Sequence, residues 1–459
     1  MNAPYDTISK TYTISELAAG YYLVKDQDNS LQGDKDEAYT DYIVQVLGNT
    51  TMAPKSEVPS VEKKVLEQSY NQDDGYGYYY NDVADWDIGD SIPFKLIGTV
   101  PDMSAYNTYT YVFHDTLSAG LTLRNDNPIT DPNGKPIRVY VANVKNATGD
   151  DLFAVRASDY TISGATQNED GTSSWTITFD NLKTAMTAPD ANKGQEGPPE
   201  PVSDYAYILV NYDAYLDSDA VIGLPGNPNE VYLEYSNNPN GAGTGTTTTD
   251  KVIVFTYELD GTKVDGANNT TKLENAQFVL LNPGKQVAVV DAKGTLVGWV
   301  SLPEEKTLET MTHADWTAFN GEQGEENHII LTSNDEGFFK VSGLEDGTYY
   351  LREIQAPTGY NLLEKDVQVV IAATTVNGQE WNGVAGNALT GLTVAVDHGD
   401  AQKGDIDTGI VNVTVANNQG STLPETGGMG TTVFYVVGGV IVAGVLVLLV
   451  AKRRMGRAE

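Results

Sequence analysis

Residues near the C-terminus combine a short peptide suited to recognition with an apolar segment and a basic end. The peptide consists of Leu423, Pro424, Glu425, Thr426 and Gly427. Pro424 holds this segment extended, and the glycines at 427 and 428 let a cleft close on its backbone. The physics of the segment therefore suits a protease recognition site.

An uncharged apolar run at 433–451 follows, and Lys452, Arg453, Arg454 and Arg457 come directly after it. A run of about 19 apolar residues is long enough to cross a ~30 Å hydrocarbon core as a helix. The basic cluster would stay in the cytoplasm, which places everything before the run outside the cell. We therefore expect one C-terminal transmembrane helix, at residues 433–451.

The order of peptide, apolar run and basic tail resembles the cell-wall sorting signal (LPXTG) of Gram-positive surface proteins. The resemblance implies that a membrane transpeptidase, sortase, attacks the Thr426 carbonyl with a Cys thiolate. The segment after Thr426 is then discarded, and the acyl group passes to an amine. An exported protein needs a basic and then apolar leader, and residues 1–6 have none, so we expect a truncated N-terminus.

The amino-acid composition limits the kinds of site that the chain can form. The 459 residues include 28 Lys+Arg and 63 Asp+Glu, giving a net charge of −35, and contain no cysteine. The length suggests two to four domains, and the charge argues against nucleic-acid binding. Disulfides and thiolate zinc sites are excluded. The four histidines (114, 313, 328 and 398) lack metal spacing, so we expect no metal and no cofactor.

Short β-rich runs recur between turn residues, at 42–47, 109–113, 137–141, 175–179, 207–210, 231–235 and 252–255. This spacing predicts an all-β chain of tandem immunoglobulin-like β-sandwiches. A Pro-bounded linker at 53–59 and a low-complexity joint at 237–250 divide the chain. The expected domains are 1–57, the end of a truncated first domain; 58–248; 249–420; and the sorting signal at 421–459.

Three further runs carry a family resemblance. Residues 349–360, beginning Tyr-Tyr-Leu-Arg-Glu, resemble the E-box of Gram-positive shaft pilins in their collagen-binding-B-type (CnaB) domains. Residues 111–117 and 232–239 resemble the isopeptide-forming middle domain of that family. With the sorting signal, the resemblance to a SpaA-type major pilin covers nearly the whole chain. Residues 17–25 echo 344–353, with Lys25 where the second copy has Glu353.

The resemblance implies a self-formed Lys–Asn isopeptide bond in each such domain, beside a buried carboxylic acid. Burial would make the amine neutral and the acid protonated, and ammonia would leave. Strand alternation in residues 60–65 turns Lys63 inward and Lys64 outward. The proposed sets are Lys63 and Asn229 (in preference to Asn237) with Asp115, and Lys263 and Asn417 with Glu353.

Lys55 occupies the place of the pilin-motif lysine, although Ala53 stands where the family has Tyr. The resemblance implies a bond from Thr426 to Lys55 of a neighbouring subunit. The implied partners are sortase, other pilin subunits, peptidoglycan and host surface ligands. The implied protein is structural and not an enzyme. A wall-anchored adhesin that never polymerises is the alternative, and a surface hydrolase is a third reading for which we find no catalytic constellation.

Overall fold

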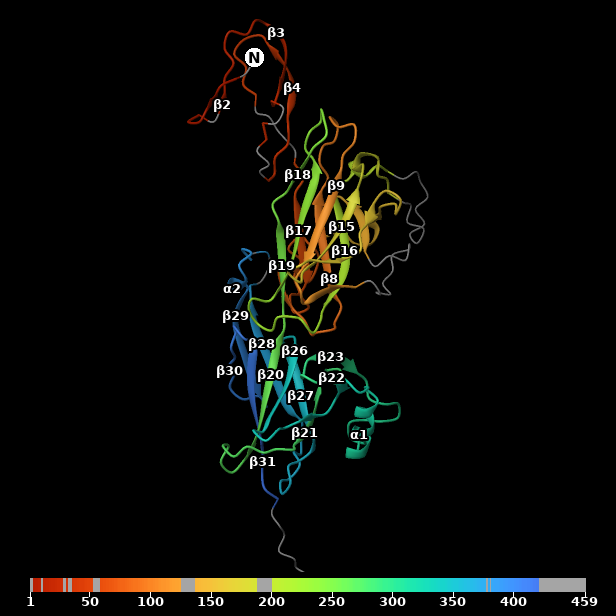
Figure 1. The fold of residues 1–459 in the computed structure, drawn as a ribbon, viewed down its shortest axis with the longest axis vertical. Coiled ribbons are helices and arrows are strands. Elements are labelled where there is room, and N and C mark those ends of the chain that lie inside the picture. The colour runs from red at the N-terminus through yellow and green to blue at the C-terminus, as the bar shows by residue number, and fades with distance from the viewer. Residues whose placement is uncertain are drawn as a thin grey trace, which may run out of the picture.

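A computed structural model describes residues 3–9, 11–27, 30–31, 35–52, 58–124, 137–187, 200–376, 379 and 381–420. The described chain is elongated (Figure 1), with the N-terminal strands at one end of the long axis and β31 near the other. Strands dominate it, which confirms the expected all-β class. No helix in these ranges is long and apolar enough to cross a membrane.

The N-terminal part consists of two small hairpins. The strands are β1 (Tyr5–Asp6), β2 (Thr11–Tyr12), β3 (Gly20–Lys25) and β4 (Asp41–Val46), paired β1–β2 and β3–β4. Tyr21, Leu23 and Ile43 are exposed on one face of the β3–β4 hairpin. The segment before β4 docks on the next domain, because the Tyr39 amide donates to the Asn237 carbonyl at 2.7 Å. An isolated hairpin is marginal in water, so this docking helps to hold it.

The middle domain is a sandwich of two sheets. The first, which we call the β5 sheet, has the order β12-β11-β16-β8-β5-β6, with β10 also paired to β16. Its strands are β5 (Val61–Leu66), β6 (Tyr80–Asn81), β8 (Ile92–Thr99), β10 (Leu121–Leu123), β11 (Arg138–Ala142), β12 (Phe153–Ala154) and β16 (Tyr207–Leu216).

The second sheet of this domain, the β9 sheet, has the order β13-β15-β9-β17-β19-β7, with β14 paired to β15 and β18 to β17. Residues of β17 alternate between buried and half-buried along its whole length, as a strand with one core face requires. The strands are β7 (Val83–Asp85), β9 (Tyr111–Leu117), β13 (Thr161–Ile162), β14 (Thr166–Gln167), β15 (Ser173–Phe179), β17 (Asn227–Ser236), β18 (Thr244–Thr246) and β19 (Asp250–Phe255).

The C-terminal domain places its first and last strands side by side. The small β20 sheet has the order β26-β20-β31, with β20 (Tyr257–Asp265) parallel to β31 (Ile410–Asn417) and antiparallel to β26 (Phe338–Leu344). The larger β27 sheet has the order β23-β22-β21-β27-β28-β29-β30, with β24 on β22 and β25 on β21. Its strands are β21 (Gln277–Leu281), β22 (Val287–Asp291), β23 (Leu296–Val300), β24 (Asn327–His328), β25 (Leu331–Thr332), β27 (Gly347–Gln355), β28 (Val367–Thr375), β29 (Leu389–Val396) and β30 (Gln402–Lys403).

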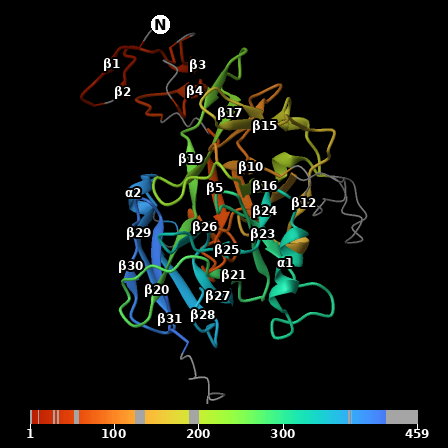
Figure 2. The same cartoon turned by 60° about the horizontal axis from the view of Figure 1, so that its bottom comes forward.

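Two helices decorate this domain, α1 (His313–Gly321) and α2 (Ala385–Ala388). Thr312 and Asp315 form a capping box that starts α1. Trp316 and Phe319 of α1 pack with β21 and β22 residues, on the face of the β27 sheet away from the main core. Figure 2 shows α1 standing to the side of the strands. The sequence analysis did not predict this helix.

The two domains join closely at β19 and β20, which only Thr256 separates. β19, which follows the expected boundary at 248/249, pairs with β17 and β7 of the middle domain. We therefore propose to move that boundary by one strand. Gly343 contacts the middle domain at a φ of 93°, and a Cβ there would lie 2.5 Å from Ile88 Cδ1. The junction thus requires glycine at this position.

Candidate isopeptide sites

The middle domain brings Lys63, Asp115 and Asn229 together in its core. Lys63 extends from β5 across the sandwich, while Asp115 and Asn229 lie on the neighbouring strands β9 and β17 of the other sheet. Lys63 Nζ is 2.5 Å from Asp115 Oδ2, and it also donates to Asn229 Oδ1. An amine, an amide carbonyl and a carboxyl group from opposite sheets therefore meet at one point.

Burial controls the protonation of this site. The three residues are at most 1% exposed. Burial lowers the pKa of Lys63 to about 8, against the opposing effect of Asp115. Burial also raises the pKa of Asp115, and the nearby Lys63 limits that rise. Both changes favour the neutral pair, a free amine beside a protonated carboxyl.

Tyr212 on β16 is a fourth member that the sequence analysis missed. Its hydroxyl donates to Asp115 Oδ2 at 3.0 Å and accepts from Asn229 Nδ2 at 2.8 Å. Alternation along β16 puts Tyr212 on the same face as Val210 and Ala214, so its inward direction was readable. Its role in the site could not be read from the sequence, because no local pattern distinguishes Tyr212 from the other buried aromatic residues.

The C-terminal domain brings together Lys263, Glu353 and Asn417. Lys263 lies on β20 and Asn417 on the parallel strand β31, while Glu353 reaches them from β27 of the other sheet. Lys263 Nζ is 3.0 Å from Glu353 Oε1 and donates to Asn417 Oδ1. Asn417 Nδ2 donates to both Glu353 oxygens at 2.8 Å. The same three functional groups as in the middle domain thus meet here.

The surroundings of Lys263 are buried, as are those of Lys63. Burial lowers its pKa, against the opposing charge of Glu353. Phe278 lies over the amine, with Nζ 5.1 Å from the ring centroid. The Leu363 amide donates to Glu353 Oε2 at 2.9 Å, and Asn417 Nδ2 also donates to the Asn361 carbonyl. Backbone groups of the segment after β27 therefore fix the orientation of both the acid and the amide.

Lys64, which alternation turns away from the core, is buried as well. It is 5% exposed, its Nζ lies 2.5 Å from Asp82 Oδ1, and Tyr76 covers it with a ring centroid at 4.5 Å. The expectation that Lys64 points outward is right about the strand face, but the loop carrying Tyr76 closes that face. In the described part of the chain, Lys64 has an acid partner without a side-chain amide, so it offers a natural comparison for Lys63.

Other predicted residues lie outside the described ranges. These are Lys55, the pentapeptide at 423–427, the apolar run at 433–451 and the basic tail. Among the residues that are described, no group of His, Asp and Glu is arranged to hold a metal ion.

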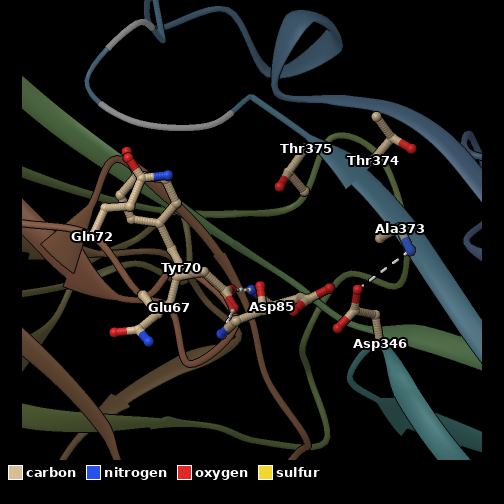
Figure 3. Close-up of a pocket in the computed structure, with 10 residues that line it drawn as sticks. Glu67, Tyr70, Gln72, Asp85, Asp346, Ala373, Thr374 and Thr375 are labelled. Atoms are coloured by element: carbon tan, nitrogen blue, oxygen red, sulfur yellow. Dashed lines mark hydrogen bonds between the residues drawn. The ribbon is translucent and has the colours of Figure 1, made fainter. Parts of the chain in front are cut away.

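A cluster of acids lies where the two domains meet, and the sequence analysis did not identify it. Glu67 and Asp85 of the middle domain and Asp346 of the C-terminal domain line a cavity of about 490 Å³ (Figure 3). Next to it, Asp87 accepts from the Glu345 amide at 2.7 Å and from Trp299 Nε1 at 2.7 Å. The domains are therefore held partly by hydrogen bonds to carboxylates.

Asp87, Glu345 and Asp346 resist ionisation, because the junction is buried and negative charges nearby repel the ionised form. Burial raises the pKa of Asp87 to about 6. Burial, and then the charges of Asp87 and Asp90, raise the pKa of Glu345 to about 9. Burial and Glu67 raise the pKa of Asp346 to about 6. The junction therefore holds protons near neutral pH.

Sequence comparisons give the wider context. A family model described as a prealbumin-like fold domain, named SpaA, matches residues 257–383, and the LPXTG cell wall anchor motif matches 416–455. The trypsin-resistant surface T6 protein of Streptococcus pyogenes is 22% identical to this chain, over 98% of the chain and 77% of that protein. The chain is thus similar in sequence to a trypsin-resistant surface protein, and it carries matches to a prealbumin-like domain and to a wall anchor motif.

Two of the solved structures that this chain resembles are pilins. The T6 backbone pilin of S. pyogenes has a TM-score of 0.48 and 17% identity, covering 92% of this chain and 84% of that one. The major pilin SpaD of Corynebacterium diphtheriae has a TM-score of 0.43 and 16% identity, covering 88% and 80%. The family and anchor matches identify a SpaA prealbumin-like domain and an LPXTG cell wall anchor motif in this chain.

Proposed function

We propose that this chain is the backbone subunit of a covalently polymerised surface pilus, stiffened by two self-formed isopeptide bonds. The observation that carries the proposal is that two domains each bury a lysine, an asparagine and an acid in mutual contact. The residues that each bond would link are 166 and 154 positions apart in sequence. Each bond would therefore tie the first part of a domain to its last strands.

The chemistry is an amide exchange. The neutral Lys63 or Lys263 amine attacks the Asn229 or Asn417 side-chain carbonyl, the new C–N bond forms, and the amide nitrogen leaves as ammonia. Holding the reacting groups in contact supplies the effective concentration that a slow exchange needs. Each reaction happens once, so this is self-modification without turnover.

Polymerisation is the second half of the proposal. Sortase would cleave after Thr426 and pass the acyl group to Lys55 of the next subunit, and the last subunit would be joined to peptidoglycan. The anchor match supports a sortase substrate. A wall-anchored adhesin that never polymerises remains the alternative, because it would carry the same anchor and the same sandwiches.

The test is covalent ladder formation in the producing bacterium. Lys55→Ala should abolish the high-mass ladder on denaturing gels of surface extracts, while Lys25→Ala, a change at an exposed position of β3, should leave it intact. Thr426→Ala should abolish both the ladder and wall attachment. A ladder that persists unchanged in Lys55→Ala excludes Lys55 as the linking amine, and a wild-type chain without any ladder favours the adhesin.

A further inference from the structure

The two isopeptide sites differ in what touches the nitrogen that must leave. In the C-terminal domain, Asn417 Nδ2 donates directly to both Glu353 oxygens. In the middle domain, Asn229 Nδ2 donates to the Tyr212 hydroxyl, and that hydroxyl donates to Asp115 Oδ2. Asp115 Oδ1 has no hydrogen-bond partner among the described residues. The tyrosine therefore stands between the acid and the leaving group.

We propose that the Tyr212 hydroxyl is a catalytic group of the middle domain, which carries a proton from Asp115 to the nitrogen leaving Asn229. This inference rests on the proposed function, since it assumes that Lys63 and Asn229 become linked. It distinguishes the two sites, because the C-terminal acid reaches its leaving nitrogen without an intermediary.

The proton balance requires such a path. The neutral Lys63 amine carries two protons and the product amide nitrogen carries one, so one proton must leave Nζ. The leaving nitrogen of Asn229 carries two protons and departs as ammonia with three. Once protonated Asp115 has passed its own proton to Tyr212, its Oδ2, 2.5 Å from Lys63 Nζ, is placed to take up the proton that leaves Nζ. Tyr212, bonded to that same oxygen, is placed to deliver one to Asn229.

The hydrogen bonds run the opposite way in the resting site, and the chemistry itself reverses them. An amide nitrogen shares its lone pair with its carbonyl, so Asn229 Nδ2 can only donate to Tyr212. When Lys63 attacks, the carbonyl carbon becomes tetrahedral and that sharing ends. The nitrogen is then a basic amine that accepts a proton. Protonated Asp115 donates to Tyr212 at the same time, and the C–N bond of Asn229 breaks.

The core holds Tyr212 in position and keeps its proton available. Its ring stacks on Phe94 at 5.3 Å and meets Trp175 edge-on at 4.9 Å, measured between centroids. Burial raises the pKa of the Tyr212 hydroxyl well above its ordinary value. The hydroxyl therefore passes a proton on while taking up another, without persisting as a phenolate.

The test compares crosslinking rates within one chain. The full chain, made by cell-free synthesis and sampled over time, is digested, and each Lys–Asn linkage is quantified by peptide mass. Tyr212→Phe keeps the ring and removes the hydroxyl. We expect the Lys63–Asn229 linkage to form roughly 100-fold more slowly, since a positioned acid–base group contributes about that much or more. The Lys263–Asn417 linkage in the same molecules should form at the wild-type rate.

Two control variants separate the hydroxyl from packing. Phe94→Leu removes the ring that stacks on Tyr212 but keeps the relay, so the middle linkage should form at close to the wild-type rate. Tyr360→Phe removes a hydroxyl that donates to Asp265 at 3.1 Å and should change neither linkage. Equal slowing by Phe94→Leu and Tyr212→Phe, or a wild-type rate in Tyr212→Phe, overturns the relay. A wild-type chain that lacks the middle linkage overturns the proposed crosslink itself.

Discussion

Lys263 and Glu353 face each other from opposite sheets of the C-terminal sandwich, with Nζ 3.0 Å from Oε1 and both side chains fully buried. A buried ion pair must overcome a large desolvation cost, and it often stabilises a fold less than apolar residues would. An amide bond to Asn417 would remove the charge of Lys263 permanently. The geometry therefore fits the precursor of a covalent bond better than it fits a permanent ion pair.

Replacing either acid should abolish one crosslink and leave the other. We expect Glu353→Gln and Asp115→Asn each to raise the intact mass of the purified chain by one ammonia, because the unreacted amide is retained. Both substitutions keep the side-chain volume. Lys64→Met, at a buried lysine that has an acid but no amide partner, should change the mass only by the difference between the two side chains. A full complement of linkages in Asp115→Asn would exclude the acid's role.

The middle crosslink should contribute strongly to stability. Closing a loop of 166 residues is worth roughly 5 kcal/mol in the chain-entropy description, which is about 10–20 °C in melting temperature for a domain of this size. Lys63→Met removes the bond while filling the core with apolar atoms, and calorimetry should show a fall of that order. Lys64→Met should cause a smaller fall. If the two variants have the same melting temperature, the covalent bond contributes nothing measurable to stability.

Crosslinking in the middle domain should have a bell-shaped dependence on pH. The reactive state of Lys63 and Asp115 holds one proton between them, which can sit on either group. Because burial lowers the pKa of Lys63 to about 8, the pair loses that proton above this pH and the rate should fall. Because burial raises the pKa of Asp115, the pair gains a second proton at a higher pH than an ordinary aspartate would. Rates measured by peptide mass across pH 4–10 check this, and a rate that keeps rising above pH 9 would contradict it.

The junction between the domains should be more stable in mild acid than in mild alkali. The pKa of Asp87 and that of Asp346 are raised from 3.8 to about 6, and the pKa of Glu345 is raised from 4.5 to about 9. The folded chain thus holds protons that the unfolded chain has released, and stability falls as pH rises from about 4 to about 9.

Glu345→Gln tests this at the junction. At pH 8 the free energy of unfolding of the variant should exceed that of wild type by on the order of 2 kcal/mol. Its stability should also depend less steeply on pH. At pH 5, where Glu345 is protonated in the folded chain, the two should be close. Glu304→Gln, at an exposed position, is the matched control and should follow wild type throughout. If the stability of Glu345→Gln depends on pH as steeply as that of wild type, Glu345 does not cause this pH dependence.

Local patterns predicted much of the fold. Period-2 alternation and turn residues located strands such as β15 and β17, and they gave the inward direction of Lys63. The partners Asp115, Asn229, Glu353 and Asn417 came from a family resemblance, since no local pattern shows that residues 154 or 166 positions apart will meet. The structure brings each set together in a buried core.

The features that the sequence did not reveal depend on tertiary contacts. Lys64 is buried because the loop carrying Tyr76 folds over its face, and Tyr212 matters because β16 lies opposite β9. The acidic junction joins Asp87 to Glu345 across 258 positions. Helix α1 is only nine residues long and was too short for its period to stand out.

The most direct measurement is the intact mass of the full chain, purified without sortase, followed by peptide mapping across Lys63, Asn229, Lys263 and Asn417. We predict a mass lower than that of the sequence by two ammonia molecules, with one linked peptide pair from each domain. A mass equal to that of the sequence, with all four residues recovered in separate unlinked peptides, would contradict it.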